Sequence, residues 1–272
     1  MFKIWQLSVW LILFLLYSLS LASFENKEQG CESLSSGSGG TASLNSAFAV
    51  FNNPSKIGLN EKADINLFYK NYYGLGEINQ ISLANHFHIG TLPLGLGIST
   101  FGNKLYRETE IRAGAAIEIV RQVRLGITLN LYQLEIKNYG SAISWGFDLA
   151  LMKHVSENIS MAFVISNLNE PKIGSASERI PAHFCFGMAY QPLNTIGMSL
   201  DIVKDDQFNF DYRFGFQYNA NRWFSIMCGF RDLVNTVSAG LKISNNEYNL
   251  NYACQYHPEL GLSNSMSIGY AF

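Results

Sequence analysis

From about residue 60 to the end of the chain, large apolar residues alternate with small or polar ones. The pattern is clearest over 143–151, where Ile143, Trp145, Phe147, Leu149 and Leu151 alternate with Ser144, Gly146, Asp148 and Ala150. Successive side chains of a strand point to opposite faces, so each such stretch predicts a strand with one apolar face. Over 208–218 every residue of the apolar face is aromatic.

Fourteen segments share this period of two and are bounded by turn residues. They are 62–72, 78–89, 92–101, 105–120, 122–136, 142–154, 158–168, 181–191, 194–204, 206–219, 222–231, 235–244, 246–256 and 262–272. The stretch 111–120 is also compatible with a helix, but its Ile and Val content and its neighbours favour a strand. The sequence therefore predicts an all-β fold of about fourteen strands.

The connections between these segments alternate between short turns and longer loops. The apolar face carries almost no charge, whereas the opposite face collects acidic and basic residues. A β-sandwich also buries one face of every strand, but it gives no reason for this asymmetry of turns. A transmembrane antiparallel barrel has short turns on one rim, longer loops on the other and an apolar face toward lipid. We therefore expect an outer-membrane barrel over residues 61–272.

The last segment ends on an aromatic residue with no polar tail. On the barrel interpretation it pairs with the first strand, so that no sheet edge remains. Tyr270 and Phe272 then lie on the lipid face, with Phe272 in the aromatic girdle. A C-terminal aromatic on an amphipathic strand also resembles the signal that barrel-assembly machinery recognises. We predict that Tyr270 and Phe272 form this assembly signal.

The N-terminus has the pattern of a secretory signal peptide. Lys3 precedes an apolar run, and Ser20-Leu21-Ala22 forms a small-x-small cleavage site, so we expect residues 1–22 to be removed after Ala22. The alternative is an uncleaved anchor, which the short, interrupted apolar run disfavours. The predicted location is the bacterial outer membrane, with its lipid as a partner.

Composition excludes several other classes of protein. Charged residues make up 15% of the 272 residues and the net charge is −2, so nothing indicates nucleic acid as a partner. The four cysteines have no metal-site spacing and are expected to act as small hydrophobic residues. No GxSxG, GxGxxG, P-loop or HExxH motif is present, so we expect no enzyme and no cofactor or metal.

Residues 23–60 precede the first strand and are the candidate occupant of the lumen. Eight strands leave a lumen filled by side chains and sixteen leave an aqueous channel, so a barrel of fourteen needs a plug or gate. The segment begins rich in Gly and Ser and becomes compact and partly apolar. We expect a lumenal hatch rather than an exposed periplasmic arm. Asn52, Asn53 and Pro54 are predicted to form its tight turn.

Within this segment, "GGTASLNSAFAVFNNPSKIGL" resembles the N-terminal signature of the FadL-like outer-membrane proteins. "ERIPAHFCFGMAYQP", "SLDIVKD", "SAGLKI" and "NYACQYHPELGLSNSMSIGYAF" follow in an order similar to the PorV/PorQ branch of that superfamily. The resemblance implies a fourteen-stranded barrel with an N-terminal hatch. It also implies either transport of hydrophobic compounds or a part in type IX secretion.

Polar residues of the lumenal face are the remaining candidates for a site. Asp148, Asp211 and Arg213 are predicted to line a transport pathway, although pairing of opposite charges across strands is the simpler role. His86 and His88 share one face of a strand, and without a third ligand we interpret them as a structural pair.

Two functions follow from this sequence. The first is a passive transporter of hydrophobic or amphipathic small molecules. The second is a surface or secretion-associated barrel whose loops, such as Glu170 to Ile180, bind a secreted protein.

Overall fold

A computed structural model describes residues 23–24, 28–60, 62–206 and 208–272. The expected signal peptide, residues 1–22, lies outside the described residues. Within the described residues, no helix is long and apolar enough to cross a membrane.

Fourteen of the described strands close into one antiparallel barrel, in which each strand pairs with its neighbours in the chain and β1 pairs with β16. The barrel strands are β1 (Asp64–Asn71), β2 (Asn79–Ile89), β3 (Leu92–Gly102), β4 (Tyr106–Val120), β5 (Val123–Ile136), β6 (Gly140–Ser156), β7 (Ile159–Ser166), β10 (His183–Leu193), β11 (Ile196–Asp205), β12 (Asp211–Asn219), β13 (Phe224–Arg231), β14 (Thr236–Ser244), β15 (Tyr248–His257) and β16 (Gly261–Ala271). The predicted fold class and strand number are confirmed.

Small or polar residues of the alternating pattern are buried inside the barrel, and the large apolar residues between them are exposed on its outside. In β16, Ser263, Ser265 and Ser267 are buried, while Met266 and Ile268 are more than half exposed on the outer surface. The stretch 111–120 lies within strand β4, paired on both sides. The outer surface of the barrel is therefore the apolar belt that a bilayer requires.

The seam lies where the C-terminal strand was expected to close the barrel. Tyr270 pairs with Ile65 of β1 in register, and the Phe272 amide donates to the Ala63 carbonyl at 2.9 Å. The Tyr270 ring stacks against Phe272 at 5.9 Å and packs on Tyr248 at 4.9 Å. The two chain-terminal aromatics thus belong to one cluster on the outer face of the seam.

The predicted segment 206–219 was too long at its start, because β12 begins only at Asp211. The Phe208 amide donates to the Asp205 carboxylate at 2.7 Å, and Phe208 lies outside any strand. Phe208 and Phe210 continue the alternation in sequence without belonging to the strand.

The connection between β7 and β10 is much longer than the other loops and carries a hairpin, β8 (Lys172–Ile173) and β9 (Glu178–Arg179). Ile173 and Ile180 are buried and pack with Tyr132 of β5. The loop predicted to meet a protein partner is therefore partly folded into the barrel.

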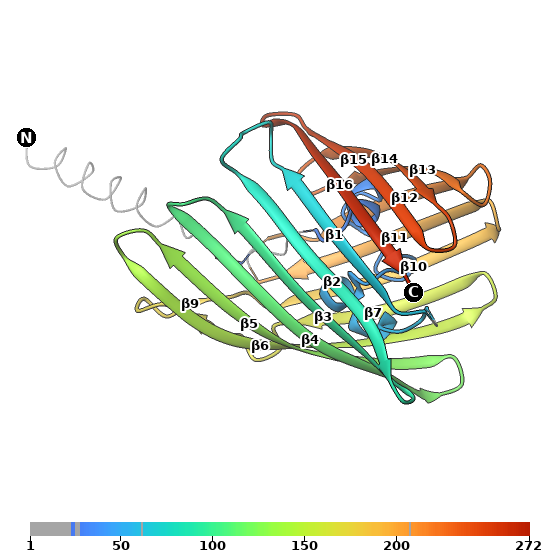
Figure 1. Cartoon of the computed structure of the whole chain (residues 1–272), viewed down its shortest axis with the longest axis horizontal. Helices are drawn as coiled ribbons and strands as arrows, with labels where there is room; N and C mark the ends of the chain where they lie inside the picture. Colours follow the sequence, from blue (N-terminus) through green and yellow to red (C-terminus); the bar gives the residue numbers. More distant parts are fainter. Residues whose placement is uncertain (1–22, 25–27, 61, 207) are drawn as a thin grey trace, which may run out of the picture.

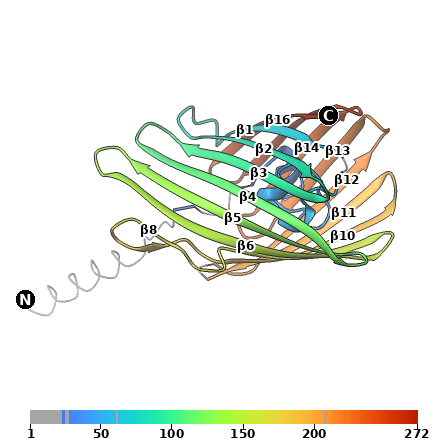
Figure 2. The same cartoon turned by 60° about the horizontal axis from the view of Figure 1, so that its bottom comes forward.

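The N-terminal segment occupies the lumen. It contains α2 (Cys31–Ser35), α3 (Ala49–Asn52) and the 3-10 turn η1 (Pro54–Lys56). Figures 1 and 2 show these short helices, in blue, enclosed by the strands. Leu34, Val50 and Ile57 are buried against the inner wall, so the segment supplies most of the apolar core inside the barrel.

Candidate functional site

Cationic side chains of the wall hold the backbone of the lumenal segment. Three arginines on separate strands donate to its carbonyl groups: Arg112 to Phe51 at 2.9 Å, Arg124 to Ser55 at 2.9 Å and Ile57 at 2.6 Å, and Arg213 to Ser38 at 2.7 Å. Hydrogen bonds to charged groups each contribute about 1.5–3 kcal/mol. The segment is therefore anchored from β4, β5 and β12 at once.

Ion pairs add to this anchoring. Glu28 lies 3.1 Å from Lys70 and 3.2 Å from Arg231, and Glu32 lies 2.6 Å from Lys242. Burial raises the pKa of Glu28, but the two neighbouring cations outweigh it, and the pKa lies well below its usual value. Glu28 is therefore ionised, and removing the segment from the lumen would break three ion pairs.

The inner wall carries glycines where the 3-10 turn η1 packs against it. A side chain at Gly126 would place its Cβ 2.1 Å from the Ser55 nitrogen, and one at Gly114 would meet the Ile57 side chain at 2.9 Å. The absence of side chains at these two positions lets the turn approach the backbone of β4 and β5.

The predicted turn residues lie at the end of α3 and the start of η1. The Asn53 side chain caps η1 by accepting from the Ser55 amide at 3.1 Å, and it donates to the Thr41 carbonyl at 2.8 Å. Asn52 donates to the Gln29 carbonyl at 3.0 Å, and Pro54 begins η1. Asn52 and Asn53 thus join distant parts of the lumenal segment.

Asp148 lies in the lumen, fully buried, and accepts four hydrogen bonds. The donors are the Arg112 guanidinium (2.7 Å), Thr128 (3.1 Å), Asn130 (2.8 Å) and the Asn167 amide (2.8 Å). Arg112 also contacts the lumenal segment, so Asp148 connects β4, β5, β6, the β7–β10 loop and that segment. The contacts of Asp148 are therefore those of a structural residue that ties several elements together, which we call the Asp148 node.

Asp211 and Arg213 are brought together, 2.8 Å apart, on the inner face of β12. Arg231 of β13 also donates to Asp211 at 2.7 Å and forms an ion pair with Glu28 at 3.2 Å. A line of alternating charges therefore crosses the lumen from Arg213 to Lys70. Asp148 lies in a separate cluster, around Arg112.

These charges form the floor of a vestibule of about 570 Å³ at the rim of the longer loops. The rest of its lining is mostly aromatic and aliphatic, with six polar residues: His183, Asp205, Asn209, Thr236, Gln255 and His257. The aromatic and aliphatic residues are Tyr72, Tyr73, Ile78, Phe101, Pro181, Val203, Phe208, Leu233, Val234 and Leu260. Tyr72 packs edge-on against Phe101 at 5.4 Å, and Lys70 lies over the Tyr72 ring at 4.2 Å. An apolar wall above a polar floor suits an amphipathic or aromatic small molecule.

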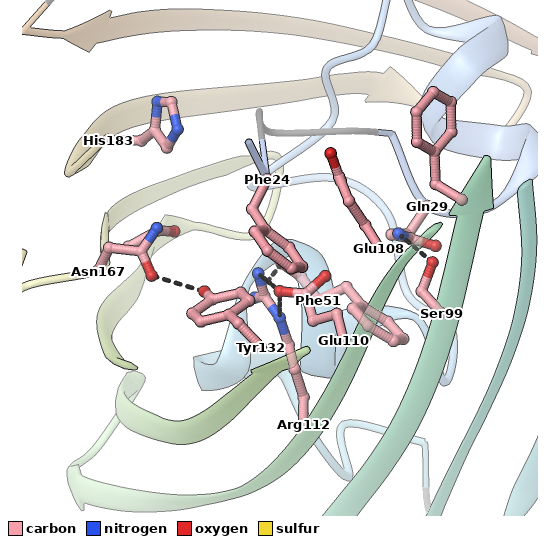
Figure 3. A pocket seen from close by; sticks show the side chains of 12 residues that line it. Phe24, Gln29, Phe51, Ser99, Glu108, Glu110, Arg112, Tyr132, Asn167 and His183 are labelled. Atoms are coloured by element: carbon pink, nitrogen blue, oxygen red, sulfur yellow. Dashed lines mark hydrogen bonds and ion pairs between the residues drawn. The ribbon is translucent and has the colours of Figure 1, made fainter. Parts of the chain in front are cut away.

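A second cavity, of only about 30 Å³, lies between the lumenal segment and the wall. Figure 3 shows Phe24 and Phe51 on either side of the Arg112–Glu110 pair, with Tyr132 bonded to Asn167. His183 borders both this cavity and the vestibule. A space of this size holds one water molecule at most.

The alternation of the strands places charged side chains on the lumenal face, but it does not supply the partners that Lys70 and Arg124 find in the N-terminal segment. It also missed Lys56, which is buried and donates to the Ala42 carbonyl at 3.0 Å. Burial lowers the pKa of Lys56 to about 7. Its place in a segment expected to fill the lumen was the available signal.

His86 and His88 lie beside each other, with ring centroids 6.1 Å apart, and His86 is hydrogen-bonded on both sides. His86 Nδ1 lies 2.6 Å from Asp64 and Nε2 lies 3.2 Å from the Asn60 carbonyl, so the ring joins β2 to the start of β1. In the described part of the chain, no group of three or more metal-binding side chains comes together.

No protein-family model matches this chain, and no curated protein matches it in sequence. Its structure is similar to the CymD monoaromatic hydrocarbon channel, with a TM-score of 0.68 and 14% identity over 89% of this chain and 97% of that one. The toluene transporter TbuX of Ralstonia pickettii gives a TM-score of 0.65 and 12% identity, over 91% of this chain and 98% of that one.

The structure is also similar to the toluene transporter TodX of Pseudomonas putida, with a TM-score of 0.64 and 12% identity over 90% of this chain and 97% of that one. A Pseudomonas aeruginosa FadL homologue gives a TM-score of 0.61 and 10% identity, over 90% of this chain and 98% of that one. The chain therefore has the fold of the FadL-type channels, as the resemblance in its sequence implied. CymD, TbuX and TodX are described as channels or transporters.

Proposed function

We propose that this protein is a bacterial outer-membrane channel for the passive entry of hydrophobic or amphipathic small molecules. The observation that carries the proposal is the vestibule, with its apolar wall at the rim of the longer loops and a charged floor that includes Glu28 of the N-terminal segment. Three of the similar structures are described as hydrocarbon channels or toluene transporters, which supports the same class of ligand.

On this proposal residues 1–22 are removed on export, barrel-assembly machinery inserts residues 61–272, and residues 23–60 act as the hatch. The hatch stays docked as a unit during transport, because its displacement would break the arginine contacts and leave buried charges without partners. Passage then needs only a local change within the lumen.

The alternative is a barrel of the PorV/PorQ branch that receives a secreted protein through the Glu170 to Ile180 loop. Because Ile173 and Ile180 of that loop are buried in the lumen, less of it is left for a partner. We therefore favour transport.

The test inserts purified protein into vesicles with a lipopolysaccharide outer leaflet, which slows the unaided entry of toluene. It measures ionic conductance and the rate of toluene uptake above that of protein-free vesicles, for the full chain and for a deletion of residues 31–60. The full chain should take up toluene with little conductance, and the deletion should conduct ions. Toluene uptake by both forms that is no faster than uptake by protein-free vesicles would rule out the channel.

A cross-link tests whether the hatch stays docked. Cys31 of α2 lies 3.4 Å, sulfur to oxygen, from the Ser265 hydroxyl of β16, so Ser265→Cys places two thiols within reach of a disulfide. The variant is made with the other three cysteines replaced by alanine. Oxidised and reduced protein should transport equally, and a loss of uptake that a reductant restores would show that the hatch must move.

A further inference from the structure

Strand β6 extends beyond its neighbour β7 at the rim of the longer loops. Its pairing with β7 begins only at Leu149, whereas its pairing with β5 begins at Gly140. Residues 140–148 of β6 are therefore held by β5 on one side and have no partner strand on the other among the described residues. Figures 1 and 2 show the tip of the β5–β6 hairpin, in yellow-green, projecting at this rim.

The β7–β10 loop covers only the lower part of this edge. The Leu168 amide donates to the Phe147 carbonyl at 3.0 Å. The Asn169 side chain accepts from the Phe147 amide at 3.2 Å and donates to the Trp145 carbonyl at 3.1 Å. The loop then turns inward, and Ile173 is buried in the lumen. Within the described part of the chain, no hydrogen bond reaches this edge above the Trp145 carbonyl.

The alternation of an antiparallel ladder identifies the open backbone groups. Successive residues of such a strand direct their N–H and C=O groups to opposite sides. Because Trp145 and Phe147 direct theirs to the loop, Ile143 and Ser141 direct theirs to the same side. The edge therefore offers both groups of Ser141, both groups of Ile143 and the N–H of Trp145 to a partner.

This edge has none of the usual protection against pairing. Sheet edges are ordinarily blunted by charged residues, proline, a bulge or a covering segment. The stretch 140–145, "GSAISW", has neither a charge nor a proline, and its register with β5 is regular. The side chains of Ile143 and Trp145 are 66% and 58% exposed. An unprotected apolar edge of this kind favours addition of another strand.

The open edge also has a defined height relative to the membrane. Unpaired backbone groups of a sheet edge do not occur in the hydrocarbon layer, because no water is present there to satisfy them. The edge over 141–145 therefore lies on the water side of the rim. Its apolar side chains are then exposed where a polypeptide can reach them.

A second copy of this chain in the same membrane does not fit the edge. The strands of such barrels are tilted by about 35–45°, and a symmetric pair of barrels is related by an axis along the membrane normal. The two β6 strands would cross at about 70–90°, twice the tilt. Strands must run nearly parallel or antiparallel to share a ladder.

We propose that the edge of β6 over residues 141–145 is a docking site for an extended segment of another protein at the cell surface, which adds to the barrel wall as a further strand. On the inner face, Ala142 packs against the buried cluster of Ile173, so small side chains fit there. On the outer face, Ile143 and Trp145 favour apolar neighbours. The segment that fits therefore alternates small and apolar residues. This site is independent of the proposed transport function.

The direct test titrates the full chain, in detergent, into a fluorescein-labelled TVSVSVT peptide and follows fluorescence anisotropy. The peptide alternates small and apolar residues and should bind with saturation. The control is the same peptide with N-methylated amides, which cannot donate to a strand but can still enter a micelle. No saturable binding of TVSVSVT, or equal binding of the N-methylated peptide, would overturn the proposal.

Hydrogen–deuterium exchange locates the bound peptide. The amides of Ser141, Ile143 and Trp145 should exchange rapidly in the free chain and at least about tenfold more slowly with the peptide bound. The amides of Ala142 and Ser144 face β5 and serve as the internal control, because they should be protected in both states. Unchanged exchange at the three edge amides would place the peptide elsewhere and overturn the proposal.

A proline at the edge tests the same contact by mutation. Ile143→Pro removes one open N–H and leaves the ladder with β5 intact, since proline is tolerated where the N–H faces away from the sheet. It should weaken binding of the TVSVSVT peptide at least about tenfold. Ile143→Thr keeps the N–H and is the matched control, which should bind nearly as the wild type does. Equal binding by Ile143→Pro and the wild type would contradict the docking site.

A cross-link distinguishes a partner protein from a second copy. Ile143→Cys is made in a chain whose four native cysteines are replaced by alanine, and it is oxidised in the outer membrane of intact cells. The chain should remain monomeric. A disulfide-linked dimer would assign the edge to a second copy and overturn the proposal.

Discussion

Among single residues, Asp148 shows how much of the lumenal chemistry depends on partners. Its polarity and its lumenal face follow from the alternation of β6, but its four donors come from other strands and from the β7–β10 loop. A buried carboxylate with this many partners holds its neighbours in place. If the carboxylate were removed, each of the four donors would lose a hydrogen bond.

Replacing Asp148 by Asn should lower the free energy of unfolding by about 3 kcal/mol, because the buried Arg112 guanidinium loses its charged partner. The measurement is equilibrium unfolding in urea with the protein in detergent. Glu170→Gln is the control, since the exposed Glu170–Arg179 pair contributes less than about 0.5 kcal/mol. Equal stability of the Asp148→Asn variant and the wild type would show that the node is not structural.

Among elements, the contact between η1 and strands β4 and β5 depends on residues that have no side chain. Gly126 is unremarkable in sequence, as one glycine among 23. In the structure, a Cβ there would overlap the backbone of Pro54 and Ser55 at 2.1 Å. No feature of the local sequence indicates this, because the clash involves a segment about 70 residues away in the chain.

Gly126→Ala should therefore prevent η1 from seating and raise ionic conductance through the barrel in a planar bilayer. The new Cβ would clash with the backbone of Pro54 and Ser55, which cannot rotate away as a flexible side chain can. We therefore expect the hatch itself to be displaced. Gly197→Ala is the matched control, since its Cβ would meet only Gln217 at an ordinary 3.7 Å. Equal conductance of the two variants would contradict this role of Gly126.

For the molecule as a whole, closure of the barrel is decided at the seam between β1 and β16. The Phe272 amide bonds to Ala63, and the Phe272 ring packs on Tyr270. Both contacts lie at the end of the chain, where segments are ordinarily loosely held. Phe272 therefore contributes to the seam, and its part in an assembly signal stays a prediction.

Deletion of Phe272 should reduce the amount of assembled barrel in the outer membrane. The readout is heat-modifiable mobility on a gel, quantified against total protein. Ile268→Val, a mild change on the same face of the same strand, serves as the control. An unchanged folded fraction after the deletion would argue against an assembly role for the terminal aromatic.

The sequence by itself determined the strands, the apolar outer face and the closed barrel. These properties repeat every two residues, and each short stretch of chain carries them independently of the rest. The prediction was wrong at the start of β12, where the Phe208 amide bonds to the Asp205 side chain, a contact that the alternation of aromatic residues does not reveal.

Only the tertiary structure decided how the lumen is filled. The arginine contacts to the hatch, the charges beneath the vestibule and the contact between Phe24 and Tyr132 each join residues far apart in the chain. Such contacts depend on which strands close around the segment and at what height it lies. Local alternation identifies the residues that face inward, and three-dimensional packing alone determines which of them meet.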